Sequence, residues 1–217
     1  MTLIILTVLL LLQIPVLAGD IIGSTSITLR NPDPQSPISP FAHNRNRDNR
    51  QTLSGAASQI VVYLSESQML PVDTPPQVNP VMDQHNLTIV PHILPVVVGT
   101  TVDFPNSDAL YHNLFSLSPA RKFDLGRYPK GQSKSVTFKT PGEVHIFCDI
   151  HPSMSGVILV LPNQYFTMAD SDGNFRVRNV PAGKYTINAW HEQLQDVSVE
   201  VVVPDTGIVE VRLDLAN

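Results

Sequence analysis

The chain has 217 residues, enough for one or two domains, and a formal net charge of −5. Charged residues make up 15% of it, below the roughly 25% typical of soluble domains, and its 19 prolines outnumber its 11 glycines. This composition favours short strands joined by proline-bearing loops over amphipathic helices. The acidic balance and the lack of a basic stripe exclude a nucleic-acid-binding surface, so we expect no nucleic-acid partner.

The N-terminus is an apolar run that ends in Val16-Leu17-Ala18. A short apolar core followed by small side chains is typical of a secretory signal peptide. We therefore expect residues 1–18 to be cleaved off after Ala18, and the mature protein to be periplasmic or secreted without stable membrane insertion. An uncleaved membrane anchor is the alternative, because no Lys or Arg precedes the apolar run.

Short segments with alternating apolar and polar residues then follow one another, bounded by turn-forming residues. They predict strands over residues 24–29, 59–64, 86–90, 94–104, 110–117, 133–138, 143–147 and 155–161. A second series at hairpin spacing predicts strands over residues 165–168, 175–177, 184–190, 197–203 and 208–213. The polar segment 31–54 and the proline-rich segment 71–80 have too little apolar surface for a core and are predicted loops. The whole pattern predicts an all-β protein.

Cys148 is the only cysteine, and it comes directly after a predicted strand. His151 and Met154 follow it at intervals of three residues, and His112 lies upstream on another predicted strand. Two imidazoles, one thiolate and one thioether form the ligand set of a type 1, or blue, copper site, in which Met is the long axial ligand. A lone thiol in an oxidising compartment is prone to oxidation, and a bound metal protects it. The sequence therefore predicts one type 1 copper held by His112, Cys148, His151 and Met154.

Two neighbours of these residues have predicted supporting roles. Pro152 follows His151 directly, where its ring removes a backbone N–H and stiffens the ligand loop. Asn113 follows His112, and its side chain is expected to tie the two ligand segments together through hydrogen bonds.

These motifs, joined to residues 98–106 and 141–148, resemble the cupredoxins of the plastocyanin/amicyanin type. The resemblance implies a Greek-key β-sandwich over residues 76–162 that carries the copper on the four residues named above. The short spacing from Cys148 to Met154 is similar to that of amicyanin. The wider chain resembles the methylamine utilisation protein-like cupredoxins, which continue into a C-terminal β unit.

A second, discontinuous domain is expected from the remaining segments. Residues 19–72 and 163–217 resemble the two parts of a carboxypeptidase-regulatory-like β-sandwich, a small Ig-like or transthyretin-like fold. Residues 163–217 supply only about five strands, which is thin for an independent sandwich. We therefore predict that the cupredoxin is inserted between the second and third strands of this sandwich, and that residues 60–64 pair with strands in 184–213.

The predicted function is the transfer of single electrons between redox partner proteins, whose identity the sequence leaves open. We expect the protein to act as a monomer. The chain has neither the His-x-His and His-Cys-His motifs of a trinuclear copper cluster nor a second cysteine for a dinuclear one, so we expect no enzymatic activity. Residues 76–162 hold six acidic and six basic residues, which favours an apolar partner contact at the edge of His151. The alternatives are a periplasmic copper-binding or delivery protein without an electron-carrier role, and a docking module in which copper serves structure.

Overall fold

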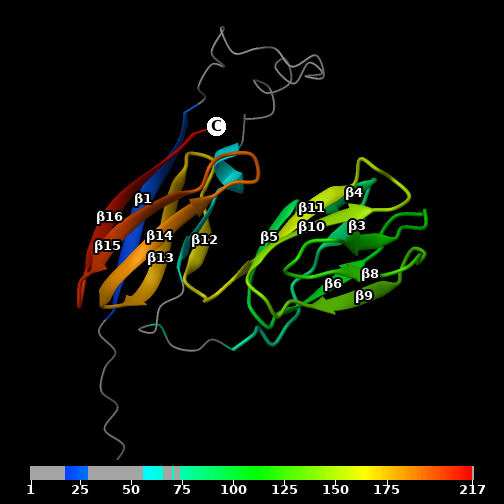
Figure 1. The fold of residues 1–217 in the computed structure, drawn as a ribbon, viewed down its shortest axis with the longest axis horizontal. Coiled ribbons are helices and arrows are strands. Elements are labelled where there is room, and N and C mark those ends of the chain that lie inside the picture. Colours follow the sequence, from blue (N-terminus) through cyan, green and yellow to red (C-terminus); the bar gives the residue numbers. More distant parts are fainter. Residues whose placement is uncertain (1–17, 29–55, 66–69, 71–73, 217) are drawn as a thin grey trace, which may run out of the picture.

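A computed structural model describes residues 18–28, 56–65, 70 and 74–216. Within these residues the fold is built of strands, with one 3₁₀ helix, η1 (Ala56–Gln59), and Figure 1 shows two β bodies next to each other. The all-β prediction is thus confirmed. None of the helical turns in the described ranges is long and apolar enough to cross a membrane. Residues 1–17 of the expected signal peptide and the predicted loop 31–54 lie outside the described residues.

The first body, which we call the Cys148 unit, contains strands β3 to β11 and is a two-layer sandwich. One layer is a five-stranded sheet in the order β5-β11-β10-β7-β8. Its strands are β5 (Ile93–Val97), β7 (Leu114–Ser116), β8 (Phe123–Asp124), β10 (Gly142–Cys148) and β11 (Ser155–Leu161). The other layer joins two pairs through isolated bridges: β3 (Asp83–His85) with β4 (Thr88–Val90), and β6 (Thr101–Pro105) with β9 (Ser133–Thr137).

The two layers of the Cys148 unit enclose one apolar core. Successive side chains of a strand point to opposite faces, so Val144, Ile146 and Cys148 of β10 share the inner face and are all buried. They meet Phe104 and Val136 of the facing layer. The thiol of Cys148 is therefore held at one end of a packed core, on the last residue of a strand that has neighbours on both sides.

The second body, which we call the terminal unit, is formed by segments from both ends of the chain. It consists of a three-stranded sheet, β13-β1-β16, and a four-stranded sheet, β12-β2-β14-β15. Its strands are β1 (Ala18–Thr28), β2 (Val61–Leu64), β12 (Phe166–Met168), β13 (Asn174–Pro181), β14 (Gly183–Trp190), β15 (Val197–Val203) and β16 (Ile208–Ala216). Side chains from both sheets, among them Ile21, Leu64, Ile187 and Leu213, form its core.

The connection between the units leaves and re-enters the terminal unit through neighbouring strands. β2 pairs antiparallel with β12, where Tyr63 faces Phe166, and with β14, where Val61 faces Trp190. Everything between β2 and β12 belongs to the linker and the Cys148 unit. The predicted pairing of residues 60–64 with strands in 184–213 is present between β2 and β14. The division into a discontinuous domain of residues 19–72 and 163–217 and an inserted domain of residues 76–162 stays a prediction.

β1 is longer than the sequence pattern indicates. It begins at Ala18 instead of residue 24, so the residue expected to end the signal peptide is also the first residue of a strand. β13 pairs antiparallel with one edge of β1, and β16 pairs parallel with the other. Gly19 pairs with Val180 of β13, and Gly23 pairs with both neighbours, so the ladders hold both glycines in a strand although glycine is depleted in strands. At Gly23 a glycine is required, since a Cβ there would lie 1.9 Å from the carbonyl oxygen of Val211.

The outer faces of two sheets form the contact between the units. On β11, Val157, Leu159 and Leu161 point away from the core of the Cys148 unit and pack against Val61 and Trp190 of the terminal unit. All five side chains are buried. The interface is therefore a small apolar cluster, separate from the cores of both units.

Polar contacts border this apolar cluster. The indole Nε1 of Trp190 donates a hydrogen bond to Oε1 of Glu143 over 2.8 Å, and Nε2 of His92 lies 2.7 Å from Oε2 of Glu192. The hydrogen bond from His92 lowers the pKa of Glu192, and the same contact raises the pKa of His92. Each of the two contacts joins one residue of the Cys148 unit to one of the terminal unit.

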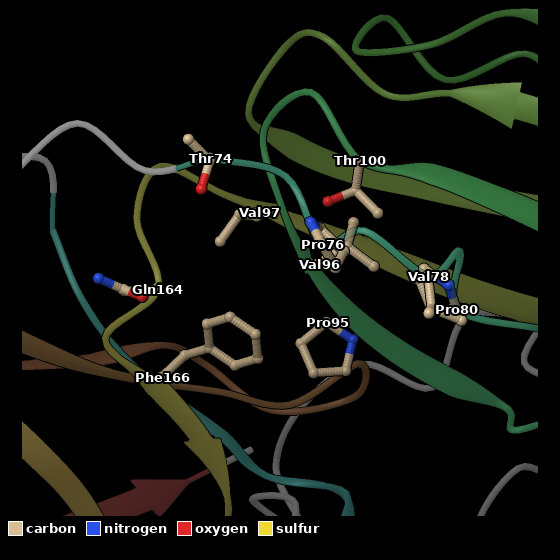
Figure 2. Close-up of a pocket in the computed structure, with 10 residues that line it drawn as sticks. All are labelled: Thr74, Pro76, Val78, Pro80, Pro95, Val96, Val97, Thr100, Gln164 and Phe166. Carbon is tan, nitrogen blue, oxygen red and sulfur yellow. The ribbon is translucent and has the colours of Figure 1, made fainter.

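At one edge of the interface the linker leaves a shallow hollow of about 440 Å³. Figure 2 shows its mainly apolar lining, in which Pro76 and Pro80 of the linker face Pro95 of β5 and Phe166 of β12. Space remains between these proline and phenylalanine rings, so the linker packs less tightly here than the side chains of the apolar interface cluster do.

Candidate metal centre

Three of the four predicted ligands meet at one end of the Cys148 unit. The Nδ1 atoms of His112 and His151 lie 3.0 Å apart, and Sγ of Cys148 lies 3.7 Å from the first and 3.8 Å from the second. His112 and Cys148 are buried, and His151 is half-buried. The structure thus brings the sulfur of Cys148 together with two imidazole nitrogens. One belongs to His112, 36 residues before Cys148, and the other to His151, three residues after it.

The chemistry and spacing of these donors fit one soft transition-metal ion. A metal about 2.0–2.3 Å from each of three donors in a trigonal plane requires donors about 3.5–4.0 Å apart. The two sulfur–nitrogen separations fall in this range, whereas the nitrogen–nitrogen distance of 3.0 Å lies below it.

The strand pairing explains why His112 lies beside Cys148. Leu114 of β7 faces Cys148 of β10, and the N–H of Asp149 donates to the carbonyl oxygen of Asn113 over 3.0 Å. On its other side His112 exchanges two backbone hydrogen bonds with Tyr128, at 3.3 and 3.0 Å. Because neighbours on both sides fix its backbone, His112 presents its ring to Cys148 from a rigid position.

The loop after Cys148 is closed by its own hydrogen bonds. The N–H of Cys148 donates to the carbonyl oxygen of Met154 over 3.2 Å. The N–H of Met154 in turn donates to the carbonyl oxygen of His151 over 3.0 Å. Met154 is 1% exposed and packs in the same core cluster as Cys148. Pro152 stands exposed inside this tight turn, where it leaves no N–H without a partner. The structure therefore places the fourth predicted ligand in the same core cluster as Cys148.

The expected tie through Asn113 is made by its main chain. Its carbonyl oxygen accepts the N–H of Asp149, as described above, while its buried Oδ1 has no hydrogen-bond partner within the described residues. A supporting role for the side chain of Asn113 stays a prediction.

The sequence reasoning missed Asp108, which contacts a predicted ligand directly. Oδ2 of Asp108 lies 3.0 Å from Nε2 of His112, and the backbone N–H groups of Leu87 and Asn86 donate to the same carboxylate over 2.9 and 2.6 Å. Burial raises the pKa of Asp108, but the hydrogen bonds from Leu87, His112 and Asn86 outweigh it, so the pKa lies below its usual value. The group is thus an ionised carboxylate at neutral pH.

The other interior and interface histidines stand outside this cluster. His145 points to the outer face of β10 and lies 3.2 Å from Glu143, while His92 belongs to the interface between the units. His191 is buried, and its Nδ1 accepts the N–H of Gln193 over 3.1 Å. In the described part of the chain, His112, Cys148 and His151 are the one group of three His, Cys, Asp or Glu donors with metal-site spacing.

One family model matches part of the chain. It is described as polysaccharide lyase family 4, domain II, and it covers residues 155–206, from the start of β11 to the turn after β15. The match thus includes strands of the terminal unit and the last strand of the Cys148 unit. A search of curated proteins finds no match.

Several solved structures are similar to part of the chain. The Cu-containing nitrite reductase of Thermus scotoductus SA-01 is 25% identical with a TM-score of 0.38, over 44% of this chain and 28% of that one. A purple cupredoxin from Nitrosopumilus maritimus is 23% identical with a TM-score of 0.34, over 38% of this chain and 99% of that one. A reduced single-residue variant of amicyanin is 24% identical with a TM-score of 0.36, over 46% and 97%. The chain therefore spans less than a third of the nitrite reductase.

Proposed function

We propose that the protein binds one copper ion as a type 1 site through His112, Cys148, His151 and Met154, and transfers single electrons between redox partner proteins. The observation that carries this proposal is the convergence of one thiol sulfur and two imidazole nitrogens within 4.8 Å of one another. A thiolate with two imidazoles in a plane and a weak axial thioether is the donor set of blue-copper electron-transfer sites.

The way the chain holds these donors suits electron transfer. When bound, copper would supply a one-electron couple between Cu(II) and Cu(I). Cys148 ends a strand that is paired on both sides, His112 is clamped between two backbone neighbours, and the loop to Met154 is closed by hydrogen bonds. Donors that are fixed in this way keep nearly the same positions in both oxidation states, so little reorganisation accompanies each transfer.

His151 is the proposed point of contact with a partner. It is half-buried, whereas His112 and Cys148 are buried, so its ring is the ligand edge closest to solvent. Pro152 next to it is exposed, and so is Tyr111 in the segment that leads to His112. An apolar partner surface would fit this rim. The burial of His112 and Cys148 also favours retention of the metal over its hand-over to another protein, which is the alternative function.

The compartment and the oligomeric state belong to the same proposal. We infer export to the periplasm or outside the cell, with cleavage after Ala18, and a monomeric mature protein. Mass spectrometry of the protein purified from the exporting cell tests the cleavage point, and a first residue other than Gly19 would contradict it.

The decisive experiment loads residues 19–217 with Cu(II). We expect an intense visible band from thiolate-to-copper charge transfer, lost in Cys148→Ser and retained in the matched control His145→Ala, whose imidazole points away from the cluster. Absence of the band in the unmodified protein would refute the type 1 site. Stoichiometric copper binding without the band would favour the delivery function. Ser153→Glu, which places a charge on the proposed rim, should slow electron exchange with the partner and leave the band unchanged.

A further inference from the structure

Asp108 joins a predicted ligand to a distant turn. Its Oδ2 accepts the backbone N–H of Leu87 and faces Nε2 of His112, and its Oδ1 accepts the N–H of Asn86. The His112 side chain is fully buried, and that of Asp108 is 11% exposed. A carboxylate with three donors and little access to water has few other orientations open to it.

Protein neighbours on two sides fix the position of Asp108. Asn86 and Leu87 form the turn between β3 and β4 and have φ angles of 51° and 56°, a left-handed conformation that costs energy for residues other than glycine. Their N–H groups are aimed at the carboxylate, which compensates this cost. From the other side, Oδ1 of the buried Asn106 accepts the N–H of Asp108 over 2.9 Å.

The contact determines which nitrogen of His112 is free to bind a metal. Both oxygens of Asp108 accept backbone N–H groups, so the carboxylate faces Nε2 of His112 as a hydrogen-bond acceptor, and this contact selects the tautomer with the proton on Nε2. In the neutral ring Nδ1 is then unprotonated, and this is the nitrogen that faces Cys148 and His151. A carboxylate behind a ligating imidazole also makes the ring a stronger donor.

We propose that Asp108 is a positioning residue that sets the tautomer and the orientation of His112, and that it couples the metal centre to the turn between β3 and β4. The measurements of copper affinity and reduction potential rest on the proposed function, whereas the tautomer of His112 can be observed without any metal.

The test compares Asp108→Asn and Asp108→Ala with the unmodified protein. Asp108→Asn keeps the size and one acceptor oxygen but loses the charge, and Asp108→Ala loses all three contacts. Asp124→Asn is the matched control, because Asp124 is an exposed carboxylate of the same unit that caps only its own turn through Gly126.

The first measurement is the protonation of the His112 ring in metal-free protein by long-range ¹H–¹⁵N NMR, assigned with His112→Gln. We expect an Nε2–H tautomer in the unmodified protein and in Asp124→Asn, and a mixture of tautomers in Asp108→Ala. The second is copper affinity by competition with a chelator, together with the reduction potential. We expect affinity to fall about 10–100-fold in Asp108→Ala and less in Asp108→Asn, and the potential to rise in both because a less basic imidazole stabilises Cu(II) less.

The outcomes separate the two proposals. An unchanged tautomer, affinity and potential in both Asp108 variants, with the visible band intact, would overturn the role of Asp108 and leave the proposed function standing. No visible band in the unmodified protein would overturn the proposed function, while a tautomer change in Asp108→Ala would still support the positioning role. If Asp108→Ala fails to fold by circular dichroism, Asp108→Asn decides, since it preserves the packing of the turn.

Discussion

The contact between the two units depends most on Trp190, and its removal is the sharpest test of how the units are coupled. Trp190 is 3% exposed and lies in the apolar interface cluster. Truncation of a buried tryptophan to alanine costs about 3–5 kcal/mol. Trp190→Phe keeps most of the apolar contact and loses the hydrogen bond to Glu143. A hydrogen bond to a charged group is worth about 1.5–3 kcal/mol. The lower end applies here, since the Glu143 side chain is 44% exposed.

The assay is urea unfolding followed by circular dichroism, which reports both units. Trp190 is the only tryptophan of the chain, so its fluorescence in the unmodified protein reports the interface itself. We expect both signals to change together, because the apolar cluster couples the units. Val202→Ala is the control: Val202 is 66% exposed, and surface substitutions stay within about 0.5 kcal/mol. A cost below about 1 kcal/mol for Trp190→Ala, or a fluorescence transition well before the circular dichroism transition, would refute the coupling.

Four further changes test other parts of the structure. His92 has a raised pKa, so the stability that it contributes is complete below its ordinary value of 6.5 and is lost as the pH rises through the folded-state value. Glu192→Gln should therefore flatten the fall in melting temperature as the pH rises above 6.5. Glu192 has a lowered pKa, so its own contribution is present above 4.5 and is lost as the pH falls through the folded-state value. Gly23→Ala should unfold the terminal unit or cost more than about 3 kcal/mol in urea titrations, since its Cβ would collide with the backbone of β16; a wild-type midpoint would show that the sheet adapts. Met154→Leu should keep the visible band and raise the reduction potential measured by voltammetry, because a lost thioether donor destabilises Cu(II); an unchanged potential would argue against axial ligation. Replacement of residues 66–162 by a two-residue turn should leave a folded terminal unit by NMR, and an unfolded product would contradict the proposed insertion.

The candidate site could be predicted in large part because most of its residues are close together in the sequence and their types indicate the chemistry. The spacing of Cys148, His151 and Met154 and the alternation along residues 143–147 put the thiol on the inner face at a strand end, as the structure has it. His112 could be added because it lies on a separate strand-like segment, whereas alternation puts His145 on the opposite face from Cys148. Asp108 could not be predicted, because its role depends on hydrogen bonds from the turn between β3 and β4. That turn lies more than 20 residues away in the sequence.

The same physical reason explains where the fold prediction fell short. The first part of β1 contains Gly19, Asp20 and Gly23, which disfavour strands, and only Ile21 and Ile22 favour one. Its partners, β13 and β16, lie more than 150 residues away and supply hydrogen bonds on both edges. Pairing between distant segments decides these elements, and local propensity does not report it.

The parallel pairing of β1 with β16 has a mechanical consequence. Its register sets Asp20 opposite Ile208 and Thr28 opposite Ala216, so the chain enters this pair at one end of the ladder and leaves it at the other (Figure 1). A pull between the two ends of the chain would load the ladder in shear, where its bonds must break together instead of peeling apart one by one. The Cys148 unit hangs from β2 and β12, outside the path of that force. The proposed metal ligands would therefore stay unstrained until the terminal unit ruptured.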